Sequence, residues 1–107
     1  MDVALSHATR LEPVIDWIAR EGRLAEALAL SLEHVRRSRL EPGCISHAVH
    51  HDAENPNRLF FFEQWADQAA VAAHFAVPAS RAFVKALGVL ATEAPQLAMY
   101  DGRRLTN

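Results

Sequence analysis

The residues of this chain best suited to acid–base chemistry are its histidines and one glutamate. His47, His50 and His51 lie close together in a segment that we expect to be a strand. Because side chains alternate along a strand, His47 and His51 share one face and His50 points to the other. No cysteine or carboxylate lies beside them at a spacing typical of zinc sites. We therefore expect no metal here, and interpret the three as solvated or pocket-edge histidines, with His47 the candidate for the pocket.

Glu63 and Trp65 point to the same face of a second predicted strand. A carboxylate beside an indole, in a partly apolar setting, would have a raised pKa and would suit a general base. The alternative is structural. An inward glutamate often pairs with a backbone amide or an arginine, and a tryptophan often belongs to the core.

His74 is the residue that we expect to act as the base. Its neighbours at helical spacing are apolar, which places it on the inward side of a helix. Burial disfavours the charged ring and a nearby carboxylate such as Glu63 favours it, so the pKa would stay close to neutrality and suit removal of a phenolic proton. The alternative is a core histidine bonded to a backbone carbonyl.

Proline and glycine divide the chain into elements that would position these residues. Residues 1–12 lack periodicity and precede Pro13, so we interpret them as an N-terminal extension to a single domain over residues 13–107. The order β-α-β-β-α-β predicts an α+β, ferredoxin-like fold, with an antiparallel sheet covered by helices on one face. We expect strands at 14–19, 44–52, 59–65 and 96–102, a helix within 23–40, and a second helix over 67–90 that Pro78 interrupts and Ser80 caps again.

The first predicted helix carries an apolar stripe at helical spacing. Its members are Leu24, Leu28, Ser31, Leu32 and Val35. The third strand, by contrast, is apolar on both faces, because Leu59 and Phe61 alternate with Phe60 and Phe62. Two helices cover only one face of a sheet, so we expect a second copy of the chain to cover the other, or one aromatic pair to line a ligand cavity.

Charge and composition exclude several classes of partner. Eleven Lys and Arg stand against 13 Asp and Glu, a net charge of −2, so no large basic surface is available for phosphates. Cys44 is the only cysteine and cannot form an internal disulfide. No apolar run approaches the roughly 20 residues that span a bilayer, and the N-terminus lacks the pattern of a secretory signal. We expect a cytoplasmic protein that binds neither nucleic acid nor membrane.

Three short motifs together resemble the antibiotic biosynthesis monooxygenase domain. They are Arg39-x-Glu41-Pro42-Gly43-Cys44, then Glu63-x-Trp65-x-Asp67, then Ala70 to His74. The resemblance covers about Val14 to Gly102. It implies a homodimer whose two sheets pack into an α/β barrel, with a pocket between each sheet and its own helices. It also implies cofactor-free oxygenation of a small phenol, quinol or anthrone by molecular oxygen.

The same family includes haem-degrading enzymes and an isomerase, so a non-oxygenase ligand binder or isomerase-like protein is the alternative function. The haem-degrading members resemble one another in a strand Asn, a helix Trp and a later His. This chain has Asp16 and His74 at the first two positions and no later histidine in that helix, so haem degradation is disfavoured. We expect His74 and Glu63 to be catalytic. The predicted substrate-contacting residues are Asp16, His47, Phe61, Trp65, Phe83 and Tyr100.

Overall fold

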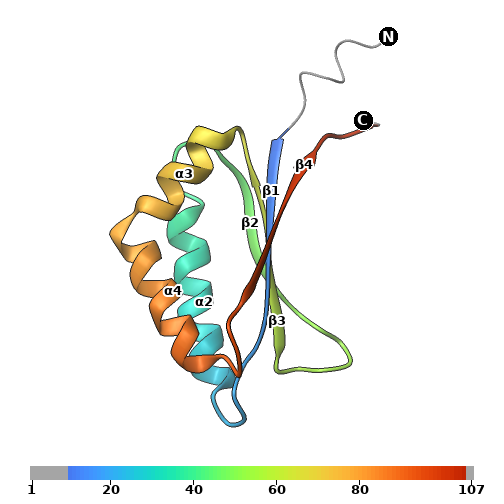
Figure 1. Ribbon diagram of the computed structural model, residues 1–107, viewed down its shortest axis with the longest axis vertical. Coiled ribbons are helices and arrows are strands. Elements are labelled where there is room, and N and C mark those ends of the chain that lie inside the picture. Colours follow the sequence, from blue (N-terminus) through green and yellow to red (C-terminus); the bar gives the residue numbers. More distant parts are fainter. Residues whose placement is uncertain (1–9, 106–107) are drawn as a thin grey trace.

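The computed structural model describes residues 10–105 and shows one four-stranded antiparallel sheet covered by helices on a single face (Figure 1). The strand order is β2-β3-β1-β4, and every neighbouring pair is antiparallel. This confirms the α+β, ferredoxin-like prediction. The elements are β1 (Arg10–Ile18), α2 (Leu24–Ser38), β2 (Cys44–His51), β3 (Arg58–Trp65), α3 (Gln68–Ala76), α4 (Pro78–Leu90) and β4 (Gln96–Gly102).

The first strand begins earlier than the sequence predicted. Arg10 to Glu12, expected to belong to the N-terminal extension, pair with Gly102 to Tyr100 of β4. Pro13 lies within the strand, and the register between β1 and β3 skips Glu12 and Pro13, where a residue without an N–H cannot donate. The proline therefore does not mark the start of β1. The rest of the predicted extension, residues 1–9, lies outside the described residues.

The break between α3 and α4 also differs in detail. Asp67 caps α3 as expected, with its carboxylate accepting from the backbone N–H of Ala70 at 2.8 Å. Val77 has extended backbone angles and Pro78 is the first residue of α4, a position where the missing N–H costs no hydrogen bond. Ser80, expected to be the cap, instead lies buried inside the helix.

The buried face of α2 is rotated from the apolar stripe that the sequence indicated. Leu32 is 39% exposed, whereas His34 is only 5% exposed. Small side chains dominate the buried positions, which allows the helix to pack close to the sheet. The buried residues of α2 are Ala27, Ser31, His34, Val35 and Ser38.

Two local irregularities position the ends of β2 and α3. Gly43 has φ of 83°, and a Cβ at this residue would lie 2.5 Å from the Cβ of Ala70, so the turn after α2 packs directly on α3. In the β2–β3 ladder, the register shifts by one residue between Cys44 and Ser46. Beyond that shift His47 faces Glu63 on the helix-covered side.

The core lies between the sheet and the helices. It includes Trp17, Leu59 and Phe61 from the sheet and Phe83 and Leu87 from α4. On the opposite face, Phe60 and Phe62 of β3 are half-buried, and no helix among residues 10–105 covers that face (Figure 1). No helix in the described part of the chain is long and apolar enough to cross a bilayer.

Candidate functional site

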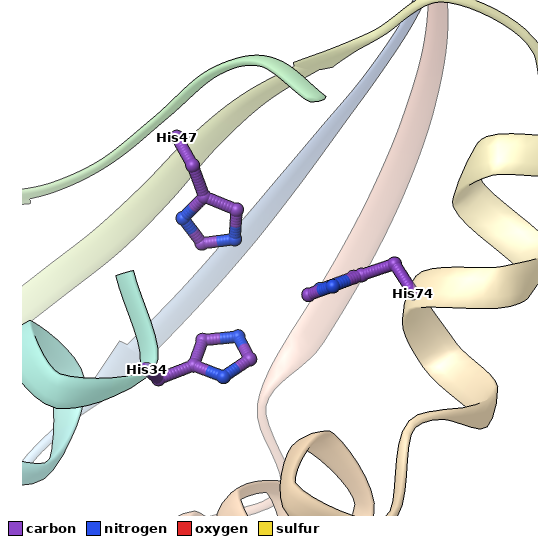
Figure 2. Close-up of side chains that lie close together, drawn as sticks. All are labelled: His34, His47 and His74. Atoms are coloured by element: carbon purple, nitrogen blue, oxygen red, sulfur yellow. The ribbon is translucent and has the colours of Figure 1, made fainter. Parts of the chain in front are cut away.

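Four buried polar side chains from four elements meet between the sheet and the helices. They are His34 of α2, His47 of β2, Glu63 of β3 and His74 of α3, and each residue is at most 5% exposed. The imidazole centroids lie 5.2 Å apart for His34 and His47, 5.3 Å for His34 and His74, and 5.5 Å for His47 and His74. Figure 2 shows the three rings converging on one point. We call these four residues the histidine cluster.

A carboxylate orients His74 within the cluster. Its Nδ1 lies 2.8 Å from Oε1 of Glu41, in the turn after α2. Because an ionised carboxylate only accepts hydrogen bonds, Nδ1–H donates and a neutral ring keeps its lone pair on Nε2. That nitrogen lies 3.9 Å from Oε1 of Glu63. His74 thus has the arrangement of a general base whose tautomer and ring orientation are set by a carboxylate.

Glu63 and His47 form a buried and incompletely bonded pair. Oε1 of Glu63 accepts from Nε1–H of Trp65 at 2.9 Å. Its Oε2 lies 3.4 Å from Nε2 of His47, too far for a strong hydrogen bond. Within the described chain, this Oε2 and both ring nitrogens of His47 have no hydrogen-bond partner. Because buried polar groups are normally hydrogen-bonded, these atoms are candidates for contact with a ligand or a substrate.

His34 has the opposite tautomer from His74. Its Nδ1 lies 2.9 Å from Nη2 of Arg37, and because a guanidinium only donates, Nδ1 accepts and the neutral ring carries its proton on Nε2. The ring stacks on Phe83, with centroids 4.2 Å apart and planes at 9°. Burial, and to a smaller extent the nearby His47, His74 and Arg37, together lower the pKa of His34 to about 3. His34 is therefore a neutral hydrogen-bond donor at physiological pH.

An apolar cavity of about 310 Å³ adjoins the histidine cluster. His34, His74 and Ser80 supply its polar groups, and Phe61 and Phe83 contribute aromatic walls. This volume is at the lower end of the roughly 300–1,000 Å³ of ligand pockets, so it suits a small molecule. A second cleft, of about 390 Å³, contains Glu41 and the other side of His74. His74 therefore lies between the two spaces.

Six of the eight predicted site residues come together. His74, Phe61 and Phe83 line the apolar cavity, whereas His47, Glu63 and Trp65 lie buried beside it.

The other two predicted residues are on the opposite face of the sheet. Asp16 pairs there with Arg58, and Tyr100 lies opposite Glu12 and is 55% exposed. Both follow the strict alternation of side chains along their strands, which turns them away from the helices. The structure does not bring them to the cavity.

Sequence reasoning missed His34 and Glu41. The signal for His34 was the set of small residues at helical spacing on α2, Ala27, Ser31 and Ser38, which allows close packing around it. The prediction of no metal depended only on the residues next to His47 along the strand. The cluster is instead assembled from separate elements, to which that criterion does not apply.

Comparisons with known proteins agree with this architecture. Residues 14–86 match the antibiotic biosynthesis monooxygenase family. A Synechocystis protein, sll1783, is 36% identical over 75 residues, which are 70% of this chain and only about half (51%) of that protein.

Two solved structures show the same fold. A crystal structure of an antibiotic biosynthesis monooxygenase superposes with a TM-score of 0.81 at 23% identity, covering 86% of this chain and 97% of that one. Rv0793 from Mycobacterium tuberculosis gives a TM-score of 0.84 at 18% identity, covering 92% and 99%. Because the family match covers most of the chain, the protein belongs to the antibiotic biosynthesis monooxygenase family.

Proposed function

We propose that this protein is a cofactor-independent monooxygenase that oxidises a small electron-rich aromatic, of the quinol, phenol or anthrone type, with molecular oxygen. One observation carries the proposal: Glu41 holds His74 so that its Nε2 lone pair is free, and His74 lines an apolar cavity of suitable size. Membership of the family supports the reaction class.

In this proposal the protein supplies a base, a donor and a dry cavity. His74 takes the phenolic proton, and Glu41 stabilises the imidazolium that forms. The Nε2–H of His34 donates to the phenolate oxygen, and its tautomer is set by Arg37. Phe61 and Phe83 exclude water, so that the electron-rich anion meets oxygen in an apolar setting.

The substrate itself supplies the electrons. For an anthrone, one atom of O₂ becomes the new carbonyl oxygen, and the other leaves as water with the two hydrogens of the oxidised methylene. For a quinol, one oxygen atom enters the ring as a hydroxyl group and the quinol is oxidised to the quinone, again with release of one water. Neither reaction needs an external reductant.

The test is oxygen uptake with a reduced naphthoquinol or an anthrone, in buffer treated to remove metals. We expect one O₂ consumed per substrate and no accumulation of peroxide. His74→Ala should lower kcat by roughly 10²–10⁴-fold, the range typical of acid–base groups, while the fold is retained. Uptake no faster than in the absence of protein would instead favour the non-oxygenase binder or isomerase-like alternative. A His74→Ala variant that reacts at the wild-type rate but melts at a lower temperature would make His74 structural.

A further inference from the structure

The geometry points to a second property of the histidine cluster: we propose that Nε2 of His47, Nε2 of His74 and the carboxylate of Glu63 bind one divalent first-row transition metal ion. This property goes beyond the proposed oxygenation, which needs no metal. Two imidazoles and one carboxylate form a ligand set that takes zinc, iron(II) or cobalt(II).

The spacing of each imidazole from the carboxylate is close to that of such a site. Around an ion with tetrahedral coordination and bonds of about 2.0–2.2 Å, the ligand atoms lie about 3.3–3.6 Å from one another. Nε2 of His47 lies 3.4 Å from Oε2 of Glu63, and Nε2 of His74 lies 3.9 Å from Oε1 of the same carboxylate. Both distances lie within a few tenths of an ångström of that range.

Two unsatisfied atoms of the cluster are those that an ion would satisfy. Oε2 of Glu63 and Nε2 of His47 lack hydrogen-bond partners among residues 10–105, although both residues are at most 2% exposed. Burying a carboxylate without a strong partner is costly, and a cation between Glu63 and the two imidazoles would compensate its charge.

The surrounding groups also resemble those that orient metal ligands. Glu41 accepts from Nδ1–H of His74, which leaves Nε2 free to bind, and Trp65 donates to the carboxylate of Glu63. His34 has a different role. Arg37 keeps its proton on Nε2, so the ring would donate to a water or anion on the ion instead of binding the ion itself. His34 and His74 line the apolar cavity, which provides the route of entry.

Metal binding and base catalysis exclude each other in this geometry. An ion on Nε2 of His74 occupies the lone pair that would take the phenolic proton. Bound metal should therefore inhibit the proposed oxidation, and removing it should restore or raise the rate.

The experiment is a titration of chelator-treated, desalted protein with Co²⁺, followed by displacement with Zn²⁺. We expect one ion per chain and visible absorption bands of low-coordinate cobalt. His47→Gln should weaken binding by more than about tenfold, the lower bound for loss of even an outer-shell partner. Glu63→Gln gives the same test at a second ligand, and circular dichroism verifies that each variant is folded. The matched control is His50→Gln, an exposed histidine on the same strand, which should bind like the wild type.

Three results would overturn the site: no stoichiometric binding by the wild type, unchanged binding by both folded ligand variants, or an equal loss in His50→Gln. Oxygen uptake with and without Zn²⁺ separates this proposal from the proposed function. Activity that disappears with chelation and returns with iron(II) would refute the cofactor-free reaction but not the proposed metal site. Activity without any metal binding would refute the site alone.

Discussion

Acidification should destabilise this protein through His34. The pKa of this buried ring is lowered to about 3, mainly by burial, whereas a histidine in the unfolded chain titrates near 6.5. Below pH 6.5 the unfolded state therefore binds a proton at His34 that the folded state does not bind. The contribution of neutral His34 to the free energy of unfolding is fully present above pH 6.5 and is lost progressively as the pH falls towards 3.

The size of the effect follows from the shift. Each pH unit in this window costs 1.36 kcal/mol for one proton, so the 2.5 units from pH 6.5 to 4 correspond to a loss of roughly 3 kcal/mol as an upper value. His34→Gln removes the titrating group and retains an acceptor for Arg37. The variant should lose roughly 3 kcal/mol less stability than the wild type between pH 7 and pH 4.

The assay is urea unfolding of both proteins at a series of pH values, at one protein concentration and with EDTA present. His50→Gln is the control, because this exposed histidine lies on the opposite face of the sheet. Its stability should vary with pH as the wild-type stability does. If the wild type and His34→Gln gave parallel curves, the buried neutral His34 would not control acid stability and the assignment would be wrong.

Three further predictions concern other parts of the molecule. Glu41→Gln should lower kcat for quinol oxidation and alter its pH profile with little change in KM, and Glu41→Asp should recover part of the rate; unchanged kcat and pH profile would exclude an orienting role. Burial, Glu63 and Glu41 raise the pKa of Cys44 against the opposing effect of Arg39, so at pH 8 the folded chain has less thiolate than the unfolded chain. Iodoacetamide should therefore react more slowly with the folded chain than with the chain unfolded in urea, and equal rates would contradict this prediction. The apolar outer face of β3 should pair two chains, so light scattering should give twice the 11.9 kDa monomer mass, and a monomer at micromolar concentration would refute the homodimer.

The order of strands and helices was predictable because it depends on local patterns. Alternation in β2 and β3, and the breaks at Pro42, Gly43 and Pro78, are visible in the sequence and recur in the structure. The burial of Glu63 and His74 followed from the same patterns, since their neighbours are apolar at strand and helix spacing.

Contacts between distant elements were not predictable in this way. Glu41 reaches His74 across 33 residues, because the turn at Gly43 packs on α3. His34 was not identified because hydropathy predicted Leu32, two positions earlier, as part of the buried face of α2. Asp16 and Tyr100 were misplaced because the side to which a strand residue points depends on register, which a single strand does not reveal.

The register shift between Cys44 and Ser46 determines which histidine enters the interior. Cys44 pairs with Trp65 and Ser46 with Gln64, so Ile45 is the extra residue of the bulge. If the same residues continued the register of Cys44 without a bulge, strict alternation would carry His50 inward and His47 outward. The bulge therefore selects which imidazole enters the cluster. Loss of the bulge with the sequence kept would exchange one candidate ligand for another, so family members of similar composition need not share the same chemistry.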